Sequence, residues 1–345
     1  MEDPSNHSPW KRKVAIAYGV TGGRHPQMLG AAAAINEAFS QDFDVIAHFG
    51  SSGGAIVAGV MSAELHKIEG GLESWLELST PYGKYGKIGG CNLPCNIWNL
   101  FCHGGLLKSS ALYEKVFKKM FSTMELKSPA YTIAWCPSHS REVLFDLTKC
   151  CPGKAVAASA SLPFAISPME ISNQELISLG YETLLPGILD DPDGSSFFVD
   201  GGISSALGVG IVDNAVEIQE EESLTGISVP VIGINIDPVS YGHTPGFGKH
   251  SWYKKIWEAC WGTVRANVLD DIREAESERY VQLSVLPTPE EFMYLSSKFD
   301  ASLSENLALF NTGYSQAETW LNTKIDGVNK PVAAMTAWYE EKEAN

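Results

Sequence analysis

A serine flanked by glycines is the first residue of this chain whose setting could support chemistry. Residues 50–54 read GSSGG and match the pattern G-x-S-x-G around Ser52. In that pattern the serine occupies a tight turn between a strand and a helix, and its small neighbours let a carbonyl carbon approach the hydroxyl. The pattern predicts that Ser52 is a nucleophile and that Gly50 and Gly54 support its turn. The alternative is a flexible turn or a phosphate-binding loop.

An aspartate after a short apolar segment could supply the base that such a serine needs. A hydroxyl is a weak nucleophile until a neighbouring group accepts its proton. Residues 197–199 predict a strand that ends at Asp200 and is followed by Gly201 and Gly202. Open α/β folds collect functional groups at the carboxyl ends of their strands. We therefore expect Asp200 to be the base for Ser52, and the alternative is an ordinary Asp-Gly-Gly turn.

The segments around these residues predict alternating strands and helices. Residues 14–18 form an apolar run of strand length, followed by a glycine-containing loop and by apolar residues at helical spacing. Residues 44–49 and 56–65 repeat that order. Such units predict parallel strands, because parallel strands need a long crossover, and so the fold class is α/β with a central, mainly parallel sheet flanked by helices. Further strands are expected at residues 131–135, 143–145, 197–199 and 229–236.

Composition and charge exclude several classes of protein. Of the 345 residues 44% are hydrophobic and 19% charged, which is enough apolar content for a buried core. The formal net charge of −16 argues against binding to nucleic acid. No apolar stretch follows the basic residues of the N-terminus, and the uncharged segments at 45–63 and 88–107 are interrupted by polar residues. We therefore expect a cytoplasmic protein without a signal peptide or a transmembrane segment.

Together, the two motifs resemble the patatin-like phospholipase family, whose members use a Ser–Asp dyad without a catalytic histidine. Two further segments are similar to that family: residues 157–168, where small residues are followed by prolines, and residues 299–317, which resemble its last helix. The resemblance spans about residues 14–320. It implies a three-layer architecture and a lipid acyl hydrolase of the phospholipase A or lysophospholipase type. The implied substrate is a phospholipid or another acyl ester.

The resemblance also implies an oxyanion hole, and here the chain departs from the family pattern. Family members carry a G-G-G-x-[R/K]-G loop after the first strand, whose backbone N–H groups stabilise the tetrahedral intermediate. In this chain residues 20–25 read VTGGRH, and two of the glycines and the closing one are replaced. We expect the amides of Gly22, Gly23 and Arg24 to serve. The Asn and Pro that follow the family's aspartate are also absent after Gly202.

The dyad implies an acyl-enzyme mechanism that needs neither a metal nor an organic cofactor. Asp200 accepts the proton of Ser52, the loop amides hold the oxyanion, and a water activated by the same carboxylate releases the fatty acid. The sequence indicates no particular protein activator.

Three alternatives remain open. A Ser-His-Asp esterase could use His243 or His250, which follow Asp200 in the chain order of the α/β-hydrolases. The altered glycine loop could instead leave a catalytically weak or inactive module that binds lipid or protein. A zinc site is the third alternative, although the spacing of its ligands is not that of the usual zinc hairpins; its residues would be Cys91, Cys95, Cys102 and His103.

One domain is expected to hold these sites. It would cover residues 14–325, between an N-terminal tail at 1–13 and a C-terminal tail at 326–345. Within it, residues 79–107 predict an irregular insertion or lid, and residues 251–325 a helical completion of the domain.

Aromatic and basic residues predict peripheral contact with a membrane. Residues 252–261 combine tryptophans and a tyrosine with two lysines, as interfacial helices do. A second group of lysines predicts a basic face that could meet lipid headgroups, namely Lys108, Lys115, Lys118, Lys119 and Lys127. Core packing and an ordinary solvated helix face are the alternatives.

Overall fold

The structure is a computed structural model, and it describes residues 11–40, 42–68, 70–77, 93–205, 207–208, 210–236, 262–263, 266–271, 273, 280–287, 301–322, 324–325 and 328–344. Several predictions lie outside these residues: those for His243, for His250, for Cys91, for residues 252–261 and for residues 79–92 of the expected lid.

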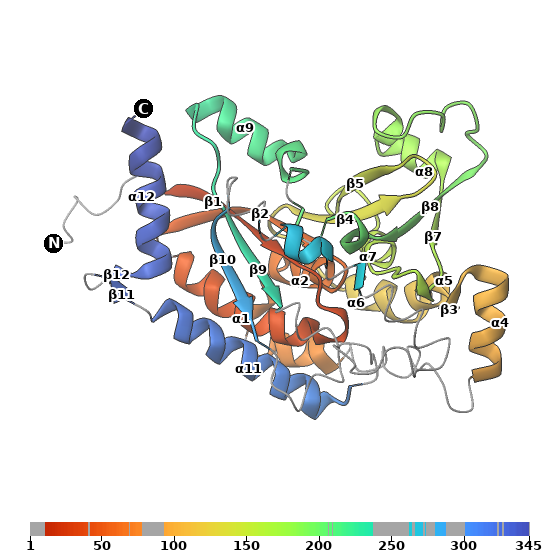
Figure 1. Cartoon of the computed structure of the whole chain (residues 1–345), viewed down its shortest axis with the longest axis horizontal. Helices are drawn as coiled ribbons and strands as arrows, with labels where there is room; N and C mark the ends of the chain where they lie inside the picture. The colour runs from red at the N-terminus through yellow and green to blue at the C-terminus, as the bar shows by residue number, and fades with distance from the viewer. Residues whose placement is uncertain are drawn as a thin grey trace.

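A mostly parallel sheet forms the centre of the protein, which confirms the predicted fold class (Figure 1). Eight strands of the described residues build it, in the order β10-β9-β1-β2-β4-β8-β7 with β5 beside β4. The parallel strands are β1 (Arg12–Tyr18), β2 (Phe43–Ser51), β4 (Ala130–Cys136), β9 (Val231–Ile236) and β10 (Tyr280–Leu286). The antiparallel strands are β5 (Arg141–Asp146), β7 (Met169–Ser172) and β8 (Ser195–Asp200).

Helices cover both faces of this sheet, which explains why its inner strands are continuous apolar runs. Along β1 the side chains alternate between two apolar clusters: Val14 and Ile16 face one, and Ala15 and Ala17 face the other. The first cluster includes residues of α1 (His25–Phe39), α2 (Gly53–Ser62) and α11 (Leu303–Leu321). The second includes Ile218 of α9 (Val216–Thr225). Figure 1 shows α1 and α11 below the sheet and α9 above it, which makes three layers.

The C-terminal end of the chain is folded, whereas a tail was expected at residues 326–345. It contains the short hairpin of β11 (Lys324–Ile325) and β12 (Val328–Asn329) and the helix α12 (Lys330–Ala344). Met335 and Tyr339 of α12 are buried, and the Tyr339 hydroxyl donates a hydrogen bond to the Lys13 carbonyl of β1. The apolar contacts of α12 therefore join this end of the chain to the sheet.

The region expected to complete the domain with helices also contributes a strand. Within residues 251–325, β10 pairs in parallel with β9 at one edge of the sheet, and α11 packs against α1. The alternation of polar and apolar side chains in β10 fits an edge strand better than a helix.

A group of short elements lies at the end of the molecule opposite to α12 (Figure 1). It consists of α4 (Leu93–His103), β3 (Gly105–Leu107), α5 (Ser109–Leu112), a π turn (Tyr113–Phe117), α6 (Lys118–Phe121), α7 (Pro152–Ser159), β6 (Phe164–Ile166) and α8 (Asn173–Ser178). The described part of the expected irregular insertion is thus a regular helix and a strand. None of the helices in the described residues combines the length and apolar character that crossing a bilayer requires.

Candidate active site

Ser52 occupies a strained turn between a strand and a helix. β2 ends at Ser51, α2 begins at Gly53, and Ser52 between them has φ 57° and ψ −124°. Residues other than glycine rarely adopt a positive φ, and such backbone strain is concentrated at functional sites. The glycines of the motif are required by crowding, since a Cβ added to Gly50 or Gly54 would lie 2.2 Å from a backbone oxygen. This geometry is that of a nucleophile at the apex of a tight turn.

The side chain of Asp200 meets the hydroxyl of Ser52, 148 positions away in the chain. The Ser52 Oγ donates a hydrogen bond of 2.7 Å to Asp200 Oδ2, and the Gly202 N–H donates one of 2.9 Å to Asp200 Oδ1. Both side chains are buried, with 6% of Ser52 and 1% of Asp200 exposed. Both carboxylate oxygens are therefore oriented, and one faces the hydroxyl.

The pairing of strands explains how these two residues meet, and it differs from the expected arrangement. Asp200 was expected at the carboxyl edge of a parallel sheet, but β8 runs antiparallel to β4. Asp200 pairs with Ala134 of β4, whose neighbour Ile133 pairs with Ser51 of β2. Asp200 therefore lies beside the carboxyl ends of β2 and β4, as expected, although its own strand runs in the opposite direction. Gly201 fits there because a Cβ would lie 2.3 Å from the Ile133 carbonyl oxygen.

The segment of small residues after β5 holds the backbone of both dyad residues. The Ser52 N–H donates to Ser159 Oγ at 2.9 Å, and the Ser159 hydroxyl donates to the Ile133 carbonyl at 2.5 Å. The Asp200 N–H donates to the Ser161 carbonyl at 3.0 Å. Ser159 is fully buried. Sequence reasoning noticed this segment only through the family resemblance and gave Ser159 no role; its buried hydroxyl bridges the nucleophile turn to β4.

The glycine loop after β1 lies against both dyad turns. A Cβ added to Gly53 would lie 1.9 Å from Thr21 Oγ1 and 3.0 Å from the Gly22 carbonyl oxygen. A Cβ added to Gly202 would lie 2.4 Å from a methyl carbon of Val20. The loop is therefore placed where an oxyanion hole for Ser52 would be needed.

Within the loop, Gly22 has φ 57°, the left-handed conformation that glycine adopts without strain. The Arg24 N–H, expected to be one of the oxyanion donors, instead donates to the Thr21 carbonyl at 3.2 Å, and its side chain is fully buried. Gly22 and Gly23 lie in this turn, and Gly53 directly follows the serine at the start of α2.

Burial controls the electrostatics of the dyad. Removal from water disfavours the charged carboxylate and raises the pKa of Asp200 to about 7, while its hydrogen bonds from Ser52 and Gly202 oppose the rise. An aspartate with a pKa near neutrality is a stronger base than an exposed one, and it is still ionised in a large fraction of molecules at physiological pH.

The histidines of the described residues take no part in this dyad. His48 stacks on the ring of Tyr18, and its Nδ1 lies 3.0 Å from the Tyr18 hydroxyl oxygen. His25 lies edge-on to Trp75. Burial lowers the pKa of His48 to about 3 and that of His25 to about 4, so both rings are neutral at pH 7. Among the described residues, the hydrogen bonds of the Ser52 and Asp200 side chains go only to each other and to Gly202.

The cysteines proposed as zinc ligands show no such arrangement in the described part of the chain. Cys95 and Cys102 of α4 are exposed free thiols, and His103 follows at the end of the same helix. No group of three histidine, cysteine or acidic side chains that could hold a metal ion is found among the described residues.

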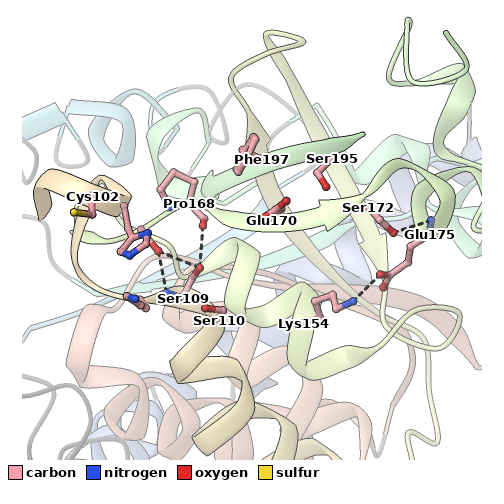
Figure 2. Close-up of a pocket in the computed structure, with 13 residues that line it drawn as sticks. Cys102, Ser109, Ser110, Lys154, Pro168, Glu170, Ser172, Glu175, Ser195 and Phe197 are labelled. Atoms are coloured by element: carbon pink, nitrogen blue, oxygen red, sulfur yellow. Dashed lines mark hydrogen bonds and ion pairs between the residues drawn. The ribbon is translucent and has the colours of Figure 1, made fainter. Parts of the chain in front are cut away.

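A cavity of about 720 Å³ lies apart from the dyad (Figure 2). Its walls come from the end of α4, from α5, from Lys154 of α7 and from β7 and β8. Ser195 and Phe197 of β8 line it, and because successive side chains of a strand face opposite ways, Asp200 is on the other face of that strand. Its lining is polar: serines, Lys108, Glu170 and an ion pair in which Lys154 Nζ lies 2.6 Å from Glu175 Oε2. This cavity is therefore not where an ester would meet Ser52.

Comparisons with known proteins give structural likeness only. No family model matches the chain, and no curated protein matches its sequence. The crystal structure of VipD from Legionella pneumophila is 11% identical, with 88% of this chain and 67% of VipD covered and a TM-score of 0.33. The type III effector protein ExoU is 12% identical, with 97% and 60% covered and a TM-score of 0.27. The complex ExoU-SpcU from the type III secretion system of Pseudomonas aeruginosa is 14% identical, with 97% of this chain and 60% of that chain covered and a TM-score of 0.30. The chain thus spans three-fifths of the ExoU chains, and these TM-scores are too low to establish a shared fold.

Proposed function

We propose that this protein is a serine ester hydrolase that acts on lipid acyl esters through a Ser52–Asp200 dyad. The observation that carries the proposal is the hydrogen bond of 2.7 Å from the Ser52 hydroxyl to Asp200 Oδ2, made at a turn where Ser52 has a positive φ. A buried carboxylate aimed at a serine on a strained turn is the arrangement that nucleophilic catalysis requires. The motifs that resemble the patatin-like phospholipases support the same activity.

The first half of the reaction forms an acyl-enzyme. Asp200 Oδ2 accepts the proton of the Ser52 hydroxyl while Oγ forms a bond to the ester carbonyl carbon. The negative charge that develops on the carbonyl oxygen is stabilised by the amides of Gly22, Gly23 and Gly53. The bond to the alcohol then breaks, and the departing alkoxide takes the proton from the Asp200 carboxyl group.

The second half releases the fatty acid. Asp200, ionised again, accepts a proton from a water molecule whose oxygen attacks the acyl carbon. The bond between that carbon and Ser52 Oγ breaks, and Oγ recovers the proton from Asp200. Every proton transfer uses one carboxyl group, so a base with a pKa near 7 suits both halves of the cycle. An ester is the substrate that fits, because an alkoxide leaves more readily than an amine.

The resemblance further supports a phospholipase A or lysophospholipase activity. With the cytoplasmic location that we expect, the protein would meet its lipid from the water phase. The catalytic domain that we propose for this activity covers residues 14–325, to which α12 adds a packed helix.

The test is whether Ser52 reacts as a nucleophile and whether Asp200 is needed for turnover. Purified protein is incubated with a fluorophosphonate label, with a chromogenic short-chain ester and with phospholipid vesicles, beside Ser52→Ala and Asp200→Asn variants. Ser51→Ala is the matched control, because Ser51 is equally buried in the neighbouring position and its hydroxyl makes no hydrogen bond to a described residue. Labelling and hydrolysis that persist in Ser51→Ala and vanish in Ser52→Ala are expected. Labelling that is unchanged in Ser52→Ala would refute the proposal.

A catalytically silent lipid- or protein-binding module is the second candidate. The observation that favours it is the Arg24 amide, which donates to the Thr21 carbonyl and so is withdrawn from the oxyanion hole. Each oxyanion donor is worth roughly 10²–10³ in turnover. Wild-type rates no higher than those of Ser52→Ala would favour this candidate, and loss of activity in His243→Ala or His250→Ala would favour a triad instead.

A further inference from the structure

The exposed aromatic side chains of the described residues gather in one group of elements. Trp98 and Phe101 of α4 are 68% and 79% exposed, Phe164 of β6 is 46% exposed, and Phe197 of β8 is 48% exposed. No other aromatic residue in the described part of the chain has an exposed side chain. Single exposed apolar residues are ordinary, but a group of large aromatic ones marks a surface that contacts something apolar.

The chain connects these four residues through adjacent elements. The Asn99 side chain donates a hydrogen bond of 3.4 Å to the Leu106 carbonyl, which ties α4 to β3. β3 pairs in parallel with β6, with Gly105 opposite Phe164. The cavity of Figure 2 has the end of α4 on one side and Phe197 on the other. We refer to Trp98, Phe101, Phe164 and Phe197 as the aromatic surface.

Phe164 combines an unusual backbone conformation with an exposed ring. Phe164 has φ 65°, which is a rare conformation for a bulky residue. The residues on both sides are held, since the amides of Ala165 and Ile166 donate to the Leu162 carbonyl at 3.1 and 2.8 Å. If burial of apolar side chains alone decided the conformation, the ring of Phe164 would point into the core. Its outward position is therefore a second sign that the surface has a partner.

The segment that carries Trp98 and Phe101 has a charge opposite to that of the whole chain. The described residues 93–121 contain four lysines and one glutamate, whereas the chain has a net charge of −16. Lys108 lines the cavity next to His103 and has no carboxylate partner among the described residues. Exposed tryptophan and phenylalanine beside unpaired lysine are the side chains that bind the interface of an anionic bilayer, where rings reach the acyl boundary and ammonium groups meet phosphates.

We propose that the aromatic surface docks the protein on an anionic lipid bilayer. Its connection to the dyad is short: Phe197 precedes Asp200 by three residues on β8, about 10 Å along the strand, and Phe164 follows Ser161, whose carbonyl accepts the Asp200 N–H. Docking here would hold the protein at the lipid surface. Hydrolysis of that lipid rests on the proposed function, whereas binding to the bilayer does not.

The test is co-sedimentation with vesicles of phosphatidylcholine, with and without phosphatidylserine, using Ser52→Ala protein so that the lipid stays intact. Adding Trp98→Ser and Phe101→Ser should weaken binding at least about tenfold, because two rings lose their burial in the interface. Lys108→Ala should weaken binding about fivefold, and only to vesicles that contain phosphatidylserine. Leu224→Ser on α9 is the matched control, since Leu224 is as exposed as Phe101 at 79%. It should bind as the parent does.

A second readout separates docking from folding and from chemistry. With Ser52 intact, the Trp98→Ser, Phe101→Ser double variant should hydrolyse a soluble short-chain ester at the parent rate and vesicle lipid more slowly. Absence of vesicle binding by the parent, or equal loss of binding in Leu224→Ser and in the double variant, would overturn the proposal. Binding that follows the aromatic surface in a protein without any ester hydrolysis would support docking and refute the proposed function.

Discussion

Replacing Asp200 with asparagine should abolish hydrolysis and at the same time stabilise the fold at alkaline pH. Burial raises the pKa of Asp200 to about 7, whereas an aspartate in the unfolded chain has a pKa of about 3.9. Between these values the folded protein keeps a proton that the unfolded chain has lost. The free energy of unfolding therefore falls as the pH rises through this window and is level above it.

The size of the effect follows from the shift. Three pKa units correspond to about 4 kcal/mol of destabilisation at pH 8, of which about 1–2 kcal/mol is already present at pH 5. Asparagine stays neutral and has the same shape. Its Oδ1 can still accept the Gly202 N–H, and its Nδ2 faces the Ser52 hydroxyl, so the hydrogen-bonding positions remain filled. The stability advantage of Asp200→Asn should thus grow by about 2–3 kcal/mol from pH 5 to pH 8.

Urea unfolding at pH 5, 6.5 and 8 measures this difference, with Asp190→Asn as the control for an exposed aspartate. The control should show no growing advantage. In the difference between the variant and the wild type, the contributions of groups that titrate in both proteins, such as the histidines, cancel. An advantage of Asp200→Asn that is constant from pH 5 to pH 8 would refute the raised pKa. The same pKa predicts that wild-type kcat/KM on a soluble ester rises with pH up to about 7 and then levels off.

Two further substitutions test the supports of the dyad. Gly53→Ala should lower kcat and cost about 1–3 kcal/mol of stability, because its Cβ would lie 1.9 Å from Thr21 Oγ1. Adding Thr21→Ala should restore much of both losses. A double variant no better than the single one would show that the contact with Thr21 is not the cause. Ser159→Ala should lower kcat with little change in KM, because the Ser52 N–H loses its acceptor, and Ser159→Thr should recover activity. Ser161→Ala is the comparison, since that hydroxyl donates to a carbonyl of its own helical segment and activity should persist.

Local patterns predicted the inner strands and the tight turn at Ser52. β1, β2, β4 and β9 lie where apolar runs of strand length occur, because strands covered on both faces need continuous apolar side chains. The turn at Ser52 was recognisable because the glycines that its crowded backbone requires all lie within the five residues 50–54. Such features are encoded locally, and no distant partner is needed to identify them.

The remaining elements depend on partners that the sequence does not display. β7 is four residues long and exists through its pairing with β8, and β10 is fixed by its place beside β9. α12 buries only a few side chains on the sheet, so its apolar periodicity is weak. The antiparallel direction of β8 was equally unpredictable, because it comes from pairing with β4 and β7, which the residues of β8 alone do not indicate.

At the site, too, the roles of some groups depend on distant partners and could not be predicted from neighbouring residues. Ser159 could not be chosen from its neighbours, because a serine in a run of alanines gains a function only when its hydroxyl meets the Ser52 amide across the fold. The Arg24 amide was expected to bind an oxyanion, and the short helical turn of Gly22–Arg24 directs it to the Thr21 carbonyl. Backbone N–H directions depend on φ and ψ, and residue type alone fixes φ closely only at proline.

The burial of the dyad has two opposite effects on this protein. Desolvation makes a carboxylate a better proton acceptor, and it is also what makes the ionised folded state less stable. An exposed aspartate would stabilise the fold at pH 7 but would be too weak a base for a serine hydroxyl. The positive φ of Ser52 adds a strain of the same sign. A site made of strained and desolvated groups requires rigid surroundings, and these are present: the Ser159 bridge, the Ser161 carbonyl and the crowded glycines each fix one dyad residue to β4 or to its neighbours. Loosening these supports should therefore relieve strain and lower activity together.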